Sequence, residues 1–151
     1  MKIRSGFVSN SSSSSFIIGV AIVPSDRVEE AKKIADADTW SVELLEVTDA
    51  IERGRGWDND GLDVEKDVYT VSSFTYDEIS VRGVMDAYEK DQDIRIMVLS
   101  GSGDEPELDE GGWEYNYDDV DSDWFSASQM KAAEFIQELG GDYTYGAGRN
   151  G

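Results

Sequence analysis

The acidic side chains of this sequence are concentrated in one stretch, and carboxylates can bind metal ions and catalyse hydrolysis. Residues 104–123 hold ten Asp and Glu residues and no Lys or Arg. These acids are Asp104, Glu105, Glu107, Asp109, Glu110, Glu114, Asp118, Asp119, Asp121 and Asp123. Carboxylate oxygens bind hard divalent cations, and paired carboxylates serve glycoside hydrolysis and two-metal phosphoryl chemistry. Metal binding and carboxylate catalysis are therefore the first activities to test against the pattern.

The spacing of Asp119, Asp121 and Asp123 matches the first ligands of a calcium-binding loop. Such a loop also needs glycine at its sixth position and a bidentate glutamate at its twelfth. Trp124 and Met130 stand at those two positions. An EF-hand is thereby excluded, and nonspecific divalent-cation binding is the most that these three aspartates predict. We expect no resident metal and no cofactor.

Histidine and cysteine are both absent. Their absence excludes Ser-His-Asp catalysis, thiolate nucleophiles, imidazole acid–base chemistry and Cys- or His-based metal sites. With 33 acidic residues in the chain, pairs of carboxylates arise by chance, so they carry little information. We expect a protein without enzymatic activity, and an enzyme that uses only carboxylates and a metal is the third-ranked alternative.

The acidic stretch also contains aromatic residues, which a purely solvating acidic tail would lack. Aromatic side chains surrounded by charge are typical of protein interfaces, where they act as anchors. The predicted partner-binding residues are Trp113, Glu114, Tyr115, Tyr117, Asp118, Asp119, Asp121, Asp123 and Trp124. The sequence leaves open whether these aromatics bind a partner or pack onto their own domain.

The charge of the whole chain also bears on the kind of partner. The sequence has 13 Lys and Arg residues against 33 Asp and Glu residues, a net charge of −20. Such a field repels phosphate backbones, so direct binding of DNA or RNA is disfavoured. It attracts basic surfaces, including the nucleic-acid grooves of other proteins. A protein with a basic surface is therefore the predicted partner, and the oligomeric state is left open.

A membrane location is not predicted. The longest apolar run covers residues 16–23, whereas a membrane-spanning helix needs about 20 residues. No small-residue cleavage site follows this run, so it is a poor signal peptide. We expect a cytoplasmic protein.

The N-terminus carries a distinctive string, RSGFVSNSSSSSF, over residues 4–16. It resembles the N-terminus of many small uncharacterised proteins of tailed bacteriophages and of bacteria. The resemblance covers Arg4 to Phe16 only and implies a phage-type origin, with the host cytoplasm or the virion as the location. It implies no catalytic residue. By composition alone, residues 1–15 would be a flexible serine-rich arm.

The rest of the chain alternates predicted strands and helices. Strands are expected over residues 16–23, 40–47, 68–74 and 93–99 from their apolar patterns. Helices are expected over residues 26–37, 75–90 and 126–139, with a short helical turn over 49–53. Capping boxes are predicted from the pairs Asp26 with Glu29 and Thr75 with Glu78. Gly140 and Gly141 should end the last helix.

This order predicts an α+β fold of the ferredoxin-like βαββαβ type, an antiparallel sheet with two helices on one face. One domain over residues 16–141 would contain the acidic aromatic loop 104–125, and residues 142–151 would be a tail. The second face of the sheet would leave Leu45 exposed. The final helix, with Trp113 or Trp124, is the expected cover. Trp57 should fold onto the core.

Two functional hypotheses follow. The first is a phage-type accessory protein that binds a basic protein surface, one example being that of a host nucleic-acid enzyme, through the acidic aromatic loop. The alternative is a virion or assembly component whose serine-rich arm orders on a neighbouring subunit.

Overall fold

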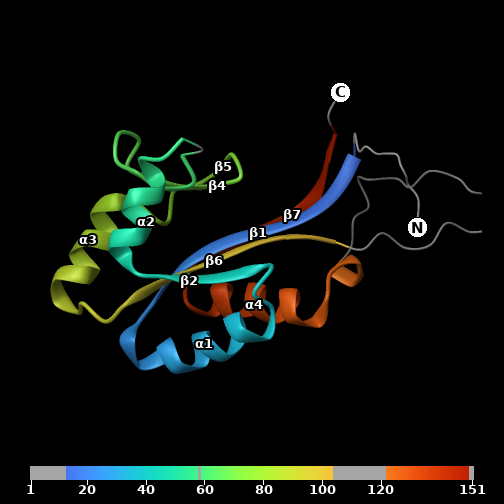
Figure 1. Cartoon of the computed structure of the whole chain (residues 1–151), viewed down its shortest axis with the longest axis horizontal. Helices are drawn as coiled ribbons and strands as arrows, with labels where there is room; N and C mark the ends of the chain where they lie inside the picture. Colours follow the sequence, from blue (N-terminus) through green and yellow to red (C-terminus); the bar gives the residue numbers. More distant parts are fainter. Residues whose placement is uncertain (1–12, 58, 104–121, 150–151) are drawn as a thin grey trace, which may run out of the picture.

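The computed structural model describes residues 13–57, 59–103 and 122–149, and these form three layers (Figure 1). A four-stranded antiparallel sheet is the middle layer, with other elements on both of its faces. Its strands are β1 (Ser13–Val23), β2 (Val42–Leu45), β6 (Arg95–Ser102) and β7 (Asp142–Arg149). The predicted α+β class is confirmed.

The strand order of this main sheet is β2-β6-β1-β7, which places β1 and β6 in the centre. On β1, Ile18 is opposite Ser100 of β6 and Thr144 of β7. All three pairings are antiparallel, so β1 runs parallel to β2 with β6 between them. In the same way β6 runs parallel to β7 with β1 between them. Helix α1 (Val28–Ala37) connects the first parallel pair, and α4 (Ala127–Glu138) lies on the connection of the second.

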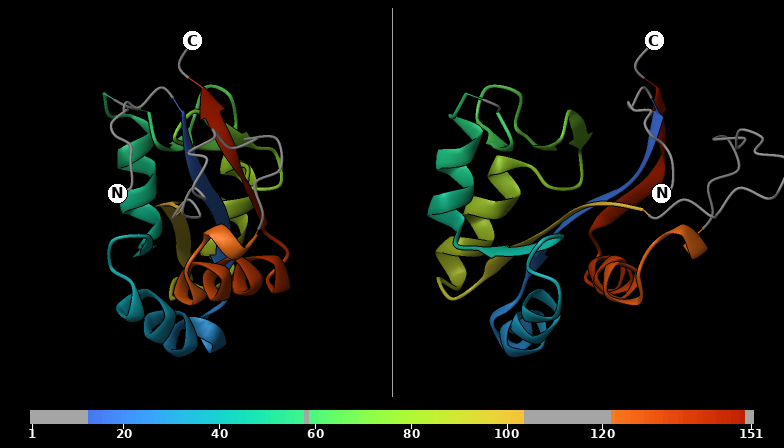
Figure 2. Two further views of the ribbon diagram at one scale, coloured as in Figure 1. Left: turned by 90° about the vertical axis from the view of Figure 1, so that its right-hand side faces the viewer. Right: turned by 45° about the vertical axis from the view of Figure 1, so that its right-hand side comes forward.

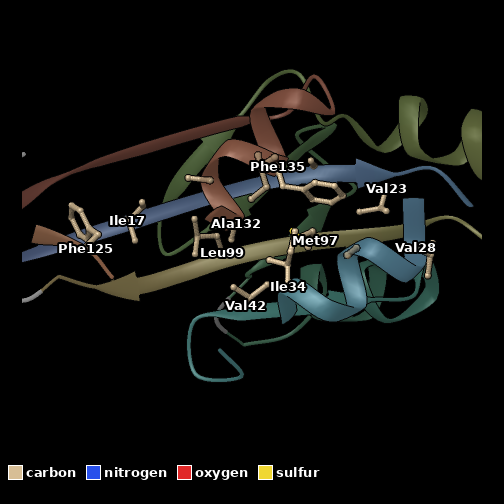
Figure 3. Packing of buried hydrophobic residues seen from close by; sticks show 14 of the residues in the cluster. Ile17, Val23, Val28, Ile34, Val42, Met97, Leu99, Phe125, Ala132 and Phe135 are labelled. Carbon is tan, nitrogen blue, oxygen red and sulfur yellow. The ribbon is translucent and has the colours of Figure 1, made fainter. Parts of the chain in front are cut away.

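Both of these helices pack on one face of the main sheet, called here the first face (Figures 1 and 2). Figure 3 shows Ile17, Met97 and Leu99 on the strands, with Ile34 of α1 and Phe135 of α4 packed over the same face. The buried residues of this first core are Ile17, Ala21, Val23, Val28, Ala31, Ile34, Val42, Met97, Leu99, Trp124, Phe125, Ala132, Ala133, Phe135 and Ile136. Burying one such large aliphatic or aromatic side chain contributes roughly 1.5–3 kcal/mol.

Arg27 joins the two helices at the surface of the first core. It forms ion pairs with Glu30 at 2.8 Å and with Glu138 at 2.6 Å, and its guanidinium lies 4.9 Å from the centroid of the Phe135 ring. The hydrogen bond from Arg27 holds the pKa of Glu30 below its usual range. These contacts fix α1 against α4 at one point beyond the apolar packing.

The second face of the main sheet is covered by the chain between β2 and β6. This insertion contains α2 (Val47–Gly54), β3 (Gly61–Asp63), β4 (Val68–Val71), β5 (Phe74–Tyr76) and α3 (Val81–Lys90). Strands β3, β4 and β5 form a separate antiparallel sheet in that order. Leu62, Tyr69 and Val84 of the insertion are fully buried beside Val20 and Ile96 of the main sheet. The sheet therefore has an apolar core on each face.

The two central strands are apolar on both sides because both of their faces are buried. Ile17 of β1 and Met97 of β6 belong to the first core, whereas Ile18 and Ile96 belong to the second. The strands predicted over residues 16–23 and 93–99 are thus confirmed as parts of β1 and β6. The helices predicted over residues 26–37 and 126–139 are also confirmed as α1 and α4, and both contribute buried residues such as Ile34 and Phe135 to the first core.

The predicted ferredoxin-like assignment is not confirmed, because the chain between residues 68 and 90 is used differently. Residues 68–74 do not form one strand of the main sheet but turn back at Ser72 and Ser73, where φ is 49° and 74°. Two consecutive positive φ values make a tight hairpin turn, and the small sheet results. The predicted helix 75–90 begins only at Val81, and α3 packs on the second face rather than beside α1.

The cover predicted for the second face was also wrong. Helix α4 lies on the first face, and Leu45 is only 8% exposed because the insertion covers it. The predicted tail is instead β7 as far as Arg149. Similarly, β1 begins inside the serine run at Ser13, and the part of the predicted arm before it lies outside the described residues.

Both predicted capping boxes are wrong. Helix α1 follows the 3-10 turn η1 (Ser25–Arg27) and has no side-chain cap, and α3 is capped by Ser80, whose hydroxyl accepts from the Gly83 N–H at 3.0 Å. The short helical turn over 49–53 is confirmed as the longer α2. Gly140, with φ of 86°, follows α4 as predicted.

Trp57 does not fold onto the core, because its side chain is fully exposed. Trp40, predicted as the first residue of a strand, lies in the turn before β2 and is 96% exposed. Both are large apolar side chains exposed to water, and Trp57 serves below as a matched control position.

The ion pair between Glu43 of β2 and Arg53 of α2 makes a pH-dependent contribution to stability. Two hydrogen bonds, of 2.9 and 2.6 Å, join the guanidinium to the carboxylate and lower the pKa of Glu43. A carboxyl group with a lower pKa in the folded state stabilises the fold above its unfolded pKa. That stabilisation disappears as the pH falls through the folded pKa.

We therefore expect Glu43→Gln to cost up to about 1 kcal/mol at pH 7 and nothing at a pH below the folded pKa of Glu43. The cost is small because about half of each side chain is exposed to water. Urea denaturation of the wild type and the variant across this pH range measures the difference. Glu46→Gln, at an exposed position before α2, is the control. A cost of Glu43→Gln that is the same at both pH values would contradict the assignment.

Candidate functional site

Four ends of the described ranges, those at Ser13, Gly103, Ser122 and Arg149, lie at one end of the main sheet. Ser13, at the start of β1, is opposite Arg149, at the end of β7, and Phe16 of β1 is opposite Ser102, at the end of β6. Figure 2 shows that the end of β7 lies beside the start of β1. The acidic stretch 104–123 joins the domain here, so this end is the candidate functional site.

Gly103 and Phe125 bring the two ends of residues 104–121 together. The Gly103 N–H donates to the Ser15 carbonyl at 3.3 Å, which extends the pairing of β6 with β1. A Cβ on Gly103 would lie 2.7 Å from Phe125 Cε1 and 2.7 Å from Ser15 Oγ. Only glycine allows this approach, since real Cβ contacts are longer. Phe125 is in turn fixed by Tyr145 of β7, with ring centroids 5.5 Å apart.

Gln129 makes a second connection between the same two ends. Its side-chain amide donates to the Ser102 carbonyl at 3.0 Å and to Ser41 Oγ at 3.1 Å. Its Oε1 accepts from the Ser126 N–H at 2.9 Å, while Ser126 Oγ accepts from the Gln129 N–H at 3.1 Å. Gln129 is only 7% exposed, so this amide satisfies several buried groups at once. The end of β6 and the start of α4 are held together by one side chain.

The network continues from α4 to the turn before β2. Ser128 Oγ donates to Asp38 Oδ2 at 3.0 Å, and Asp38 Oδ1 accepts from the Ser41 N–H at 3.1 Å. The Ser41 carbonyl accepts from the Ser100 N–H at 2.8 Å. We call Ser41, Ser102, Gly103, Phe125, Ser126 and Gln129 the base of the acidic segment, and residues 104–123 the acidic segment.

One buried hydroxyl in contact with the base has no hydrogen-bond partner among the described residues. Ser15 is 2% exposed, and its Oγ faces Gly103. An unsatisfied buried hydroxyl costs roughly 1–3 kcal/mol. The base has no charged side chain, and apart from Gly103 and the apolar Phe125 its residues form hydrogen bonds that position the two chain ends.

Of the predicted partner-binding residues, only two lie in the described ranges. Asp123 is exposed in the 3-10 turn η3 (Ser122–Trp124), directly before the base. Trp124 is 9% exposed and belongs to the first core, so its side chain packs on its own domain. The remaining predicted residues lie outside the described ranges: Trp113, Glu114, Tyr115, Tyr117, Asp118, Asp119 and Asp121.

For the weak metal prediction, Asp123 is the one member that the structure describes. Within residues 13–57, 59–103 and 122–149, no cluster of three or more carboxylates is arranged to hold a metal ion. Asp119 and Asp121 lie outside these ranges.

The sequence analysis placed the start of the last helix at Ser126 but did not identify Gln129 as a site residue. The signal was present, because Ser126 and Gln129 have the spacing of a capping box, S-x-x-Q, and the structure contains that box. The contacts of Gln129 with Ser41 and Ser102 had no local signal, since these residues are 88 and 27 positions away.

Comparisons with known proteins give no relative: no family model matches the chain, and no curated protein or solved structure is detectably similar to it. In the described part of the chain, no helix combines the length and apolar character that crossing a bilayer requires.

Proposed function

We propose that this protein acts by binding a basic surface of another protein through its acidic segment, as a phage-type accessory protein. One observation carries the proposal: a twenty-residue stretch with ten carboxylates and no Lys or Arg is attached to the domain at both ends through one hydrogen-bonded base. A base of this kind brings the two ends of the segment close together, which reduces the entropy that binding must overcome.

Electrostatic attraction supplies the encounter with the partner. The charge of −20 raises association rates with basic surfaces, and the effect weakens as salt shortens the Debye length to about 10 Å at 0.1 M. A basic nucleic-acid-binding surface of a host protein fits this chemistry, because such surfaces are built to accept a dense row of negative charge.

Trp113, Tyr115 and Tyr117 are the proposed anchors within the acidic segment. Aromatic residues dominate the energetic centres of interfaces, where loss of one side chain commonly costs about 2 kcal/mol or more. Trp124 is not an anchor in this proposal, because its side chain is buried in the first core. Its role is to fix the end of the segment.

The phage-type origin rests on the serine-rich string over residues 4–16 alone.

A second proposal concerns the fold. The interleaved units β1-α1-β2 and β6-α4-β7 support a ferredoxin-like core, with residues 46–94 inserted between its second and third strands. An experimental structure in which β2 and β6 are not neighbours would contradict this second proposal.

Capture of the partner from a host lysate tests the binding proposal with two variants of equal net charge. In the first, the ten acids of the acidic segment become Asn or Gln. In the second, ten exposed acids elsewhere are changed in the same way: Asp26, Asp36, Glu46, Asp49, Glu52, Asp77, Glu78, Asp86, Glu89 and Glu134. Both variants have a net charge of −10, so only the position of the charge differs.

We expect the first variant to lose at least about tenfold in capture at low salt, and the second variant to lose much less. Raising the salt concentration should reduce capture by the wild type and should affect the first variant least. Trp113→Ala should also weaken capture, with Trp57→Ala as the matched control at an exposed tryptophan. Equal losses in the two charge variants, or capture that ignores salt, would overturn the proposal.

A further inference from the structure

Strand β7 is an open edge of the main sheet. It pairs with β1 on one side, and no other strand in the described ranges pairs with its outer side. The strand is eight residues long, reads DYTYGAGR, and has no charged residue between its first and last positions. Proteins commonly protect edge strands with lysine, proline, bulges or a short strand length. β7 contains neither lysine nor proline.

The other edges within the described ranges are protected by their shortness. Strand β2, at the opposite edge of the main sheet, has four residues and carries the exposed Glu43. The outer strands of the small sheet, β3 and β5, have three residues each. The long, uncharged edge at β7 is therefore exceptional in this molecule.

The pairing pattern shows which backbone groups of β7 point outward. The Ser15 carbonyl accepts from Gly103, so the backbone groups of Ser15 point toward β6. In an antiparallel sheet the backbone groups of successive residues point to opposite neighbours, so those of Phe16 point toward β7, where Gly146 is opposite. By the same alternation, outward N–H and C=O groups belong to Tyr143, Tyr145 and Ala147.

This edge is held in place by its side chains. Tyr143 and Tyr145 pack against the first core, and the Tyr145 ring contacts Phe125. On the other face, the ring of Phe16 lies over Gly146, where a Cβ would be 3.4 Å from its Cζ. The outward backbone groups are thus presented on a pre-organised strand, which lowers the entropic cost of adding another.

We propose that the outer edge of β7 binds an extended, basic segment of the partner by β-strand addition. Main-chain hydrogen bonds give affinity in this mode of recognition.

The charge of the domain indicates which of two strands, one from a second copy of this chain or one from a basic partner, would pair with β7. Ten of the 33 acids and two of the 13 basic residues lie outside the described ranges, so the described domain is itself strongly acidic. It repels a second copy of this chain and attracts a lysine- or arginine-rich strand.

The inference rests on the proposed function and names a second point of contact for the same partner. The outer edge of β7 passes the point where the acidic segment leaves β6, because Gly146 of β7 and Ser102 of β6 are both opposite Phe16 of β1. One partner can contact both.

The test uses a blocked eight-residue peptide in which lysine alternates with valine and threonine. Its control is the same peptide with alternate backbone amides methylated, which keeps the charge and removes hydrogen-bond donors. Binding is measured by titration calorimetry, and hydrogen exchange of the wild-type amides is followed by NMR. The variant Ala147→Pro removes one outward N–H without touching the pairing with β1, and Ala147→Val retains it.

We expect the parent peptide to bind at least about tenfold more tightly than the methylated one, and Ala147→Pro to weaken it about 3- to 10-fold, as loss of one hydrogen bond predicts. The amide protons of Tyr143, Tyr145 and Ala147 should exchange more slowly with peptide bound. The exchange experiment uses only the wild-type protein. It therefore tests whether the peptide pairs with β7 even if Ala147→Pro fails to fold.

Equal binding of the two peptides, no binding of either, or unchanged exchange at the three amides would overturn the inference. A wild-type dimer in sedimentation experiments that Ala147→Pro converts to a monomer would also overturn it, with a second copy as the occupant. Failure of the proposed function is separate: it is the equal loss of partner capture in the two charge variants, which leave β7 unchanged.

Discussion

Replacing Gly54 with alanine is expected to lower the free energy of unfolding by about 3 kcal/mol or more. Gly54 is the last residue of α2, where the helix meets β3. A Cβ at this position would lie 1.8 Å from the Leu62 carbonyl oxygen, 2.4 Å from its carbon and 2.9 Å from the Leu62 nitrogen. All three are backbone atoms of a fully buried residue, so no side-chain rotation relieves the clash.

Chemical denaturation of Gly54→Ala beside Gly83→Ala measures the effect. Gly83 lies in α3, where the nearest atom to a new Cβ is the Ser80 hydroxyl oxygen at 3.2 Å. Alanine is a better helix former than glycine by about 1 kcal/mol, so we expect the control to be neutral or stabilising. A loss of less than about 1 kcal/mol in Gly54→Ala would show that α2 and β3 do not approach as closely as described. Because Gly54 belongs to the insertion, the base of the acidic segment should be unaffected.

The local patterns predicted the central strands and the helices α1 and α4 because each of these elements has enough length to display a period. Residues 16–23 place Ile17 and Ile18 on opposite faces, and both faces are buried. The hairpin at Ser72 and Ser73 was missed, because serine is not the residue that usually marks two positive φ values. Because this turn was not predicted, the strand expected over residues 68–74 was assigned to the main sheet. The helix expected over residues 75–90 was assigned to the same face as α1.

Strand β7 was missed for a different reason. Its glycines weaken the strand signal, and its stability comes from partners far away in the sequence, such as Phe16 over Gly146. The same limit applies to the candidate site. The acidic segment could be identified from composition, whereas the burial of Trp124 and the contacts of Gln129 depend on residues that only the fold brings together. Long-range packing thus decided that Trp124 packs on its own domain.

Replacing Gln129 with leucine should lower the free energy of unfolding by about 2–4 kcal/mol, and it should weaken capture of the partner. Leucine has a similar size but leaves the Ser102 carbonyl, Ser41 Oγ and the Ser126 N–H without their partner. An unsatisfied buried group costs roughly 1–3 kcal/mol. The matched control is Gln137→Leu, the same change at an exposed position of α4.

The variant Gln129→Glu separates the two tasks of this side chain. A carboxylate still accepts from the Ser126 N–H, as in an ordinary capping box, but it cannot donate to the Ser102 carbonyl. Burial against a carbonyl oxygen should raise the pKa of the new carboxyl group above its unfolded value. Stability of this variant relative to the wild type should therefore be greatest below the unfolded pKa and should fall as the pH rises through the folded pKa.

Urea denaturation and partner capture, measured on the same three variants, connect the base to the acidic segment. If the base positions the segment, Gln129→Leu weakens capture under conditions where the protein remains folded, and Gln137→Leu does not. A destabilised Gln129→Leu with unchanged capture would mean that the base stabilises the domain but does not position the segment. Equal stability of Gln129→Leu and Gln137→Leu would contradict the buried network itself, because an exposed glutamine has no such partners to lose.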